Sequence, residues 1–281
     1  MWILYTLIGL LFVIGALILY AVLPGRRRNT APFDRTAFAH RGLHTGDSRI
    51  PENSLPAFLR AKDLGYGVEL DVQLTADKQV VVFHDDNLLR MCGVNRRVDE
   101  LTYAELSKLR LLDSEETVPL LTDVLMILES TTILCEFKTM RSFADTSLCQ
   151  IAFPLLDNYQ GAVCVESFNP IMMRWFRKNA PHYLRGILGK RFEPEEVPSR
   201  FRGLLSAMFT NFLCRPDFIA YNYEDRDHPF FRFCRLFHPM TVAWTITNER
   251  QEKTSEKLFD TVIFEGYLPQ KHKNKTFSKK V

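Results

Sequence analysis

The longest apolar stretch lies at the start of the chain, in residues 2–23, which carry no charged side chain over 22 positions. As an α-helix this stretch would be about 33 Å long, enough to cross the hydrocarbon core of a bilayer. Pro24, Gly25 and three arginines follow at once, whereas a secretory signal carries its positive charge before the apolar core. We therefore predict a retained single-pass membrane anchor. The arginines place the following body in the cytoplasm.

Beyond residue 34, short apolar runs alternate with segments of helical periodicity. The predicted strands cover residues 35–40, 67–74, 79–83, 132–138, 162–168, 183–188, 217–221, 241–247 and 261–265. The predicted helices cover residues 55–64, 101–109, 122–128, 142–156, 170–179, 198–212, 227–237 and 249–257. Ser54 is expected to cap the first of these helices, and Gly65 to end it. Thr102 and Glu105 form a capping box for the second.

The spacing of the second and third strands sets the topology. Only four residues, 75–78, separate them, and a parallel crossover needs a dozen or more, so the two strands form an antiparallel hairpin. Without the returning strand, eight strands mostly alternate with helices over about 250 residues, which is typical of a TIM (β/α)8 barrel. A doubly wound open sheet is the competing architecture, but no Gly-rich phosphate-binding turn follows the first strand.

These elements divide the chain into four parts. Residues 1–23 are the anchor, 24–34 a basic linker, 35–268 the catalytic barrel with its small hairpin and helical insertion, and 269–281 a basic tail. The tail carries five lysines and no acid from residue 271 onward. We expect it to be a solvated, disordered end; the alternative is attraction to an anionic membrane surface.

Composition narrows the function classes. The hydrophobic share of 46% and charged share of 25% are ordinary for a globular chain, and a net charge of +3 is too small to indicate nucleic acid. No protein partner is predicted. The six cysteines are scattered without a C-x-x-C pair, which favours buried free thiols in a reducing compartment. This agrees with a cytoplasmic body.

Candidate chemistry begins in the second strand. Glu69 and Asp71 lie two residues apart, so a strand points both carboxylates to one face. Two like charges in a buried strand are costly unless a cation lies between them, and hard oxygen ligands suit Mg²⁺ or Ca²⁺. The alternative is a solvated strand face, with the intervening valines and leucine as the core side. Barrel strands are covered on both faces, which argues against it.

A barrel places its active site at the carboxyl ends of its strands. Glu136 would bring a third carboxylate to that end, and His40 and His84 a general acid and a general base. Arg41 and Lys138 can pair with a phosphate. This set suits metal-assisted phosphoryl transfer, in which positioning and charge neutralisation do most of the catalysis. Glu136 and Lys138 could alternatively pair only with each other.

Seven short motifs occur in order along the chain: AHRG (39–42), PENS (51–54), VELDVQLT (68–75), VVFHDDNL (81–88), CEFK (135–138), ESFNP (166–170) and WTITN (244–248). Together they strongly resemble the motifs of the glycerophosphodiester phosphodiesterases. With its predicted anchor, the chain looks like a membrane-anchored member of bacterial type. The resemblance runs from about residue 36 to residue 265. It implies a TIM barrel with a short insertion, matching the strand count.

The resemblance also implies a site. Its metal ligands would be Glu69, Asp71 and Glu136, its acid–base pair His40 and His84, its phosphate ligands Arg41 and Lys138, and its glycerol-side or leaving-group lining Phe168 and Trp244. The cofactor would be one Ca²⁺ or Mg²⁺. The implied reaction cleaves a glycerophosphodiester to sn-glycerol 3-phosphate and an alcohol. Cleavage through a cyclic phosphate and direct attack by water both remain open.

Two departures from the family pattern bear on substrate choice. The last strand ends in Phe-Glu-Gly-Tyr at 264–267, where many members have Thr-Asp-x-Pro, and the loop before PENS holds His44, Asp47 and Arg49. We assign no role to His44. A lysophospholipid or phospholipid headgroup, reached from the bilayer through the anchor, is the alternative substrate. A non-catalytic barrel that binds headgroups is a third reading, which the intact histidine and carboxylate sets disfavour.

Overall fold

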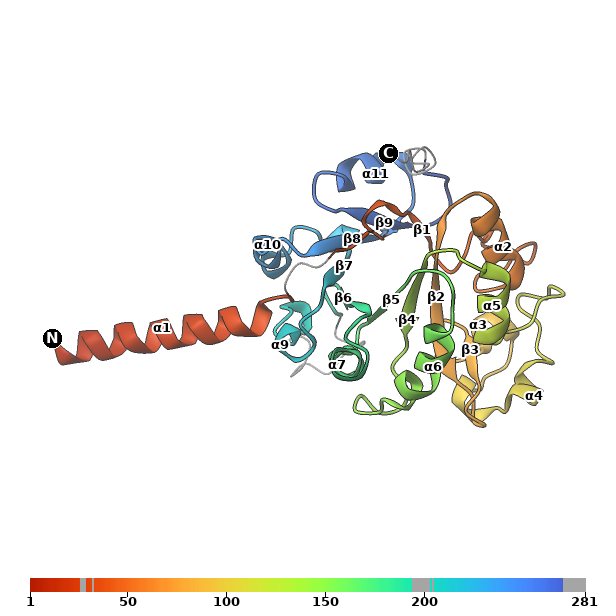
Figure 1. The fold of residues 1–281 in the computed structure, drawn as a ribbon, viewed down its shortest axis with the longest axis horizontal. Helices are drawn as coiled ribbons and strands as arrows, with labels where there is room; N and C mark the ends of the chain where they lie inside the picture. The colour runs from red at the N-terminus through yellow and green to blue at the C-terminus, as the bar shows by residue number, and fades with distance from the viewer. Residues whose placement is uncertain (26–28, 32, 194–202, 204, 270–281) are drawn as a thin grey trace.

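The computed structural model describes all residues except 26–28, 32, 194–202, 204 and 270–281. In this described part, eight parallel strands form a closed barrel, in which β1 pairs with both β2 and β9 (Figure 1). The barrel strands are β1 (Phe38–Ala39), β2 (Gly67–Leu74), β4 (Ile133–Phe137), β5 (Val163–Ser167), β6 (Leu184–Gly189), β7 (Phe218–Asn222), β8 (Met240–Ile246) and β9 (Thr261–Phe264). The predicted TIM barrel is confirmed.

Helices cover the outside of the barrel and fill the connections between strands (Figure 1). The described α-helices are α1 (Trp2–Val22), α2 (Leu55–Asp63), α3 (Leu89–Cys92), α4 (Tyr103–Leu106), α5 (Leu121–Leu128), α6 (Ser147–Asp157), α7 (Pro170–Asn179), α9 (Asn211–Cys214), α10 (Pro229–Arg235) and α11 (Glu249–Ser255). Short 3-10 turns are η1 (Phe33–Arg35), η2 (Val98–Glu100) and η3 (Tyr223–Asp225). Of the helix predicted at 198–212, residues 198–202 and 204 lie outside the described residues; its last part is a turn at 207–210, and α9 begins only at Asn211.

Some predicted boundaries are wrong. The strand expected at 35–40 is only Phe38–Ala39, because Arg35 belongs to η1 and pairing with β2 and β9 begins at Phe38. The helix expected from 142 starts at Ser147, where the side chain of Asp145 accepts the backbone N–H of Ser147 at 2.8 Å. The capping box at Thr102 is present, but the helix it opens ends at Leu106.

Both faces of the barrel strands are buried, so polar residues on the inner face must find partners there. All eight residues of β2 are buried. Val68, Leu70 and Val72 belong to the apolar layer between strands and helices, and alternation therefore turns Glu69 and Asp71 into the barrel. The solvated-face alternative for these carboxylates is wrong.

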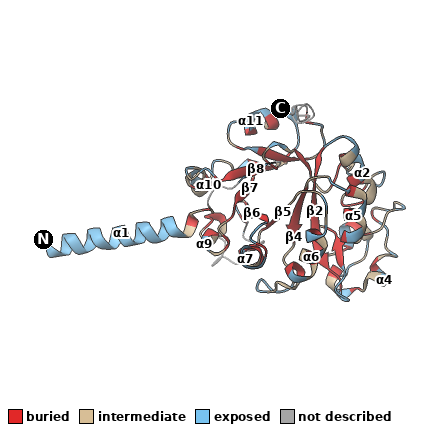
Figure 2. Ribbon diagram, in the orientation of Figure 1, coloured by how far each residue is buried: buried red, intermediate tan, exposed pale blue. Residues whose placement is uncertain are grey.

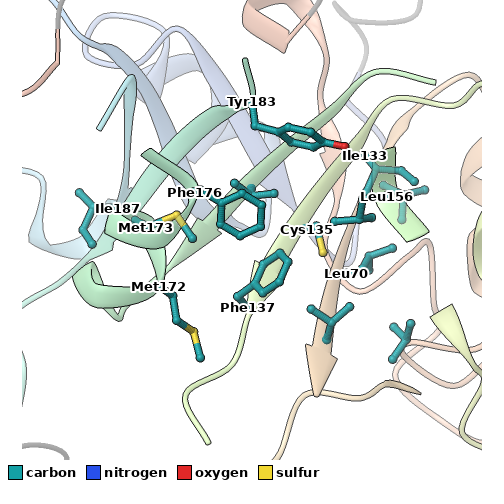
Figure 3. Packing of buried hydrophobic residues seen from close by; sticks show 14 of the residues in the cluster. Leu70, Ile133, Cys135, Phe137, Leu156, Met172, Met173, Phe176, Tyr183 and Ile187 are labelled. Carbon is teal, nitrogen blue, oxygen red and sulfur yellow. The ribbon is translucent and has the colours of Figure 1, made fainter. Parts of the chain in front are cut away.

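The apolar layer outside the strands is continuous and rich in aromatic and sulfur-containing side chains (Figure 3). The rings of Phe137 and Phe176 meet edge to face, with centroids 4.9 Å apart. Cys135 and Met172 pack in the same cluster, and in the burial view the strands are almost wholly buried (Figure 2). This layer holds helices such as α7 against the barrel by burial of apolar area.

The barrel interior near the amino ends of the strands is filled by a separate apolar cluster that includes Phe33, Phe38, Phe218 and Met240. A Cβ added at Gly186 would lie 2.0 Å from the Phe218 ring, so the glycine makes room for that ring. Because the amino-terminal part of the interior is closed by apolar side chains, its polar residues are confined to the carboxyl ends of the strands.

The hairpin prediction is confirmed. β3 (Val80–Val82) pairs antiparallel with the carboxyl-terminal part of β2, and Leu74 is opposite Val80. The insertion that follows, up to about residue 118, buries its own small apolar core, which includes Phe83, Leu88 and Leu106. β1 pairs with the amino-terminal part of β2, along the same edge of that strand. The segments that follow β1 and β3 therefore meet beside the middle of β2.

Helix α1 extends away from the barrel and is exposed along nearly its whole length (Figures 1 and 2). Within the described residues it is the one helix long and apolar enough to cross a membrane. Its carboxyl end is fixed to the barrel, because Asn211 donates to the Val22 carbonyl at 2.9 Å and Arg215 donates to those of Tyr20 and Leu23 at 3.0 and 2.8 Å. Arg215 precedes β7, so the joint lies toward the amino ends of the strands.

Candidate active site

A sharp turn after β1 opens the site. Arg41 and Gly42 have φ values of 52° and 78°, in the left-handed region. A Cβ on Gly42 would lie 2.9 Å from the backbone and Cβ of Ala57, so α2 packs directly on the glycine. The turn directs the backbone N–H of Arg41 to Glu69 Oε2, 2.8 Å away. The glycine of the HRG motif is thus required by both conformation and space.

Glu69, Asp71 and Glu136 come together inside the barrel mouth. Asp71 and Glu136 are direct partners in the register of β2 and β4. One ligand oxygen from each of the three carboxylates lies within 4.8 Å of the others, and all three residues are buried. Oδ1 of Asp71 has no hydrogen bond among the described residues. Hard oxygen donors with an unused lone pair fit a cation such as Ca²⁺ or Mg²⁺.

The pKa values of Glu69 and Asp71 are shifted in opposite directions. Burial raises the pKa of Glu69 well above its usual value, and Asp71 and Glu136 raise it further. Burial also opposes ionisation of Asp71, but Lys138, His84 and Arg41 together bring its pKa below the usual range. Neighbouring carboxyls with opposite pKa shifts are the pattern expected where more negative charge converges than the local cations neutralise.

Two cations lie at the edge of the carboxylates. Lys138 Nζ is 2.9 Å from Glu136 Oε1 and 3.4 Å from Asp71 Oδ1. Burial would lower the pKa of Lys138, but these two carboxylates raise it above the usual value. Arg41 places Nε 3.8 Å from Asp71 Oδ2 and Nη1 2.7 Å from Glu52 Oε1. Both cations therefore lie directly beside the carboxylates and are paired with them.

The PENS motif supports this arrangement. Asn53, with φ of 54°, donates its side-chain amide to Asp71 Oδ2 at 2.9 Å. Ser54 caps α2 by accepting a backbone N–H of its first turn. Glu52 accepts hydrogen bonds from Arg90 at 2.7 and 2.9 Å, as well as the one from Arg41. The motif therefore links the turn after β1 to the insertion.

His84 follows β3 and is held by its neighbour. Its Nδ1 lies 2.6 Å from Asp85 Oδ1; because a carboxylate only accepts, the imidazole donates through Nδ1 and Nε2 stays available. Arg90 binds the other oxygen of Asp85 at 2.6 Å. Gln73 donates its amide to the carbonyls of Phe83 and Asp85, both at 2.9 Å, and fixes the path of the turn.

His40 is held in a parallel way. Its Nδ1 lies 2.7 Å from Oε2 of Glu265, the residue after β9. This hydrogen bond lowers the pKa of Glu265 to about 2, against opposition from burial. His44 approaches the same carboxylate, with Nε2 3.6 Å from Oε1, while its Nδ1 accepts the backbone N–H of Gly46 at 3.0 Å. Burial lowers the pKa of His44.

An aromatic wall stands on another side of the mouth. The rings of Phe168 and Trp244 lie 5.7 Å apart at 85°, and Phe192 packs 5.8 Å from Phe168. Lys190 Nζ lies 6.0 Å from the Phe168 centroid. A hollow of about 650 Å³ opens beside His84 and is also lined by Lys138 and Arg90. The site thus offers an apolar wall and an open hollow with charged side chains along its lining.

The nine predicted site residues lie within β2, β4 and β8 or directly after β1, β3, β4 and β5. Sequence reasoning missed four polar residues that hold or adjoin them: Asn53, Gln73, Glu166 and Glu265. Gln73 had a usable signal, since it continues the every-second-residue polar pattern of β2. Glu265 was noticed only as a departure from the family pattern, because its partner His40 lies 225 residues away.

Fold and site together define a TIM-barrel protein whose mouth holds three buried carboxylates with two histidines and two cations around them. The glycerophosphoryl diester phosphodiesterase family matches residues 40–264, which is most of the chain. The chain belongs to this family.

Two curated relatives show how far the likeness extends. A glycerophosphodiester phosphodiesterase of Caldanaerobacter subterraneus subsp. tengcongensis is 31% identical over 163 residues, which cover 52% of this chain and 64% of that protein. A human lysophospholipase D is 39% identical over 106 residues, covering 37% of this chain and 32% of that protein. The matched part is thus less than two thirds of either relative.

Solved structures agree with the barrel. An Oleispira antarctica phosphodiesterase, determined in complex with the product sn-glycerol-3-phosphate, superposes with a TM-score of 0.67 at 21% identity, covering 82% of this chain and 92% of that one. A Thermotoga maritima glycerophosphodiester phosphodiesterase gives 0.61 at 22% identity, with coverages of 82% and 94%. At these identities the likeness shows the fold.

Proposed function

We propose that the chain is an enzyme that hydrolyses glycerophosphodiesters to sn-glycerol 3-phosphate and an alcohol, with one bound Ca²⁺ or Mg²⁺. The carrying observation is the convergence of three buried carboxylates, with ligand oxygens within 4.8 Å of one another, beside two histidines that each bind a carboxylate through Nδ1. Membership of the family over residues 40–264 supports the substrate class.

In this proposal Glu69, Asp71 and Glu136 hold the divalent cation. A bound divalent cation neutralises charge on the phosphoryl oxygens and helps to position the substrate. Lys138 and Arg41 pair with the phosphate from the edge of the same cluster, the guanidinium through its fork of N–H groups. Support comes from the 3.4 Å and 3.8 Å separations of these cations from Asp71, which keep them near the carboxylates.

His40 and His84 are the proposed acid–base pair. With Nδ1–H donated to Glu265 or Asp85, Nε2 of each imidazole is outside that hydrogen bond, and we assign it to the substrate. One imidazole takes the proton from the attacking hydroxyl or water as its oxygen bonds to phosphorus, and the other gives a proton to the departing alkoxide oxygen. The paired carboxylates stabilise the imidazolium that forms and fix the ring orientation.

Phe168 and Trp244 are proposed to line the glycerol side or the leaving-group side. Their edge-to-face contact at 5.7 Å gives a rigid apolar wall, and a hollow of about 650 Å³ next to His84 leaves room for a second substituent on phosphorus. A diester needs such space on both sides of the phosphate.

The direct test is release of glycerol 3-phosphate from glycerophosphocholine by the purified chain. His40→Ala and Glu69→Gln should each lower kcat by about 10³-fold, the usual range for losing a general acid–base group or metal ligand. His182→Ala serves as control, because this histidine is 61% exposed and its described contacts, with Asp157, Phe153 and Tyr183, are all with residues outside the proposed site. Chelator should abolish turnover and Ca²⁺ or Mg²⁺ should restore it. Undiminished turnover by either site variant would refute the proposal.

A second candidate function is cleavage of lysophospholipid at a membrane. Two observations favour it: the exposed apolar helix α1, and the 39% identity over 106 residues to a human lysophospholipase D. Parallel assays with glycerophosphocholine and with lysophosphatidylcholine in vesicles separate the two. If only the vesicle substrate is hydrolysed, the soluble-diester proposal is wrong. Hydrolysis of neither, with headgroup binding retained, would favour a non-catalytic barrel.

We propose further that α1 anchors the barrel on the cytoplasmic side of the cell membrane. The support is a 21-residue apolar helix that is not buried in the barrel, followed in sequence by three arginines. An impermeant thiol reagent separates the topologies. A cysteine placed at Trp2, which is 88% exposed, should react in intact cells, and one placed on the exposed Glu115 should not. Reaction at both positions would contradict the cytoplasmic placement.

A further inference from the structure

Glu166 has the least satisfied carboxyl group near the mouth. The residue lies in β5 and is 1% exposed. Neither of its carboxyl oxygens has a hydrogen-bond partner among the described residues. Most buried polar side chains in folded proteins do have partners, and removing a carboxylate from water without one costs several kcal/mol. A carboxyl group in this situation needs an explanation.

The strand register places Glu166 beside the proposed metal ligands. Glu136 in β4 and Glu166 in β5 are direct partners in the parallel ladder. Cys164 belongs to the apolar cluster inside the barrel and Phe168 packs against it, two residues before and after Glu166. Because alternate residues share one face of a strand, Glu166 also points into the barrel. Its oxygens therefore lie in the same interior layer as those of Glu136.

The other neighbours of Glu166 leave the carboxyl no protein partner. Gly186 in β6, its partner on the far side, has no side chain, and the Phe218 ring occupies the space next to that glycine. Lys138 is engaged by Glu136 and Asp71. Apolar surface thus closes one side of Glu166, and the carboxylate cluster lies on the other.

Packing alone does not account for the residue. An apolar side chain of similar size would fill the space without leaving two carboxyl oxygens unpartnered. Burial raises the pKa of Glu166 well above its usual value, and the charges of Glu136 and Asp71 add to this effect. The site would therefore be easier to form without Glu166 unless a positive or hydrogen-bonding group enters when ligands bind.

We propose that Glu166 is a fourth carboxyl of the metal site, which accepts a hydrogen bond from a water molecule on the cation held by Glu69, Asp71 and Glu136. The proposal rests on the proposed metal site and adds a residue that the acid trio does not contain. Ca²⁺ and Mg²⁺ need more oxygen ligands than three carboxylates supply singly, so water completes their shell. Partners of such waters orient the site and strengthen metal binding.

The test measures metal affinity without substrate. Ca²⁺ and Mg²⁺ are titrated calorimetrically into the full-length protein in detergent, for wild type and Glu166→Gln. We expect the Kd of the substituted protein to rise 10- to 100-fold, the usual effect of losing an outer partner of a metal site. Glu129→Gln is the matched control, because that carboxylate is 71% exposed and precedes β4 at the opposite end of the barrel. Its Kd should match wild type.

The outcomes separate this proposal from the wider one. A Glu166→Gln protein that is folded, as judged by its thermal transition, and binds metal as tightly as wild type overturns the role of Glu166 and leaves the metal site standing. Absence of metal binding by wild type overturns both. If Glu166→Gln does not fold, Glu166→Asp replaces it, since the shorter side chain withdraws its oxygens; a Kd within twofold of wild type then overturns the proposal.

Discussion

His40 Nδ1 lies 2.7 Å from Glu265 Oε2, across the seam where the last strand of the barrel closes on the first. The backbone N–H of His40 also bonds to the carbonyl of Phe264, at 2.9 Å. Closure of the barrel therefore holds His40 at two points: its main chain bonds to Phe264 and its imidazole bonds to Glu265. Glu265, at which this chain departs from the family pattern, is thus a hydrogen-bond partner of His40 as well as a residue of the barrel rim.

Replacing Glu265 should affect chemistry more than binding. In Glu265→Gln the amide can no longer stabilise a charged His40, so we expect kcat to fall about 10- to 100-fold with KM changed less than threefold. Glu265→Asp keeps the charge and should recover part of the loss. Glu224→Gln, on the exposed turn after β7, is the control for a surface carboxylate. Equal losses of kcat in the Gln and Asp variants would contradict a charge-based role.

The same carboxylate should contribute to stability in a defined pH range. Its pKa falls from 4.5 to about 2 in the folded protein. A lowered folded-state pKa stabilises the fold above the unfolded pKa, and the contribution is lost as pH falls through the folded value. Because the side chain is 37% exposed, we expect only about 1 kcal/mol at pH 6. Urea unfolding of wild type and Glu265→Gln should therefore differ at pH 6 and converge toward pH 2; a constant difference would contradict the assignment.

Arg90 should behave as a positioning residue for His84. Its guanidinium binds Asp85 and Glu52 at the same time, with four contacts between 2.6 and 3.0 Å. Lysine keeps the charge but not the fork, so Arg90→Lys should lower kcat/KM about tenfold. Arg96→Lys is the matched control: it changes an equally exposed arginine that contacts Glu100 within the same insertion. A normal kcat/KM for Arg90→Lys would show that Asp85 alone holds His84.

Gly42 and Gly46 have the same φ of 78° but different surroundings. Replacing each by alanine therefore separates the effect of backbone strain from that of side-chain crowding. A Cβ on Gly42 meets Ala57 at 2.9 Å, whereas nothing lies within 4 Å of a Cβ on Gly46. Gly46→Ala should cost about 1 kcal/mol of unfolding free energy from backbone strain alone. Gly42→Ala should cost about 2–3 kcal/mol, because α2 must also move. Chemical denaturation measures both, and equal losses would argue against the close packing of α2.

Local sequence signals explain why most of the fold could be predicted. The four residues between β2 and β3 are too few for a crossover, and the Ser54 cap and the Thr102 box mark helix starts through contacts within one turn. β2 was predicted with its observed limits because its apolar residues alternate with polar ones that a closed barrel must hide. β1 was predicted too long because its length depends on what pairs with it, and that is set by distant strands.

The site was harder to predict wherever a residue acts through a partner far along the chain. The carboxylate trio could be inferred from i and i+2 spacing and from the rule that barrel strands end at one mouth. The Glu265–His40 bond joins the two ends of the barrel, and nothing near Glu265 in sequence indicates it. The unpartnered state of Glu166 depends on Gly186 in the next strand, which only the register reveals. The contact of α1 with α9 is equally non-local.

Arg215 should hold α1 in a fixed direction relative to the barrel. Its guanidinium bonds to the carbonyl of Tyr20 in α1 and to that of Leu23 just after the helix, and it stacks on Tyr20, with Cζ 4.4 Å from the ring centroid. Arg215→Asn is the suitable change, because φ is 45° and asparagine tolerates this region. Loss of these charged hydrogen bonds should speed amide hydrogen exchange in residues 19–23 and in Gly25 about tenfold, without changing exchange in the barrel strands. Arg232→Ala on α10 should leave exchange at the joint unchanged. Slow exchange persisting in Arg215→Asn would assign the joint to Asn211 and to the bond from Gly25 N–H to the Pro216 carbonyl instead.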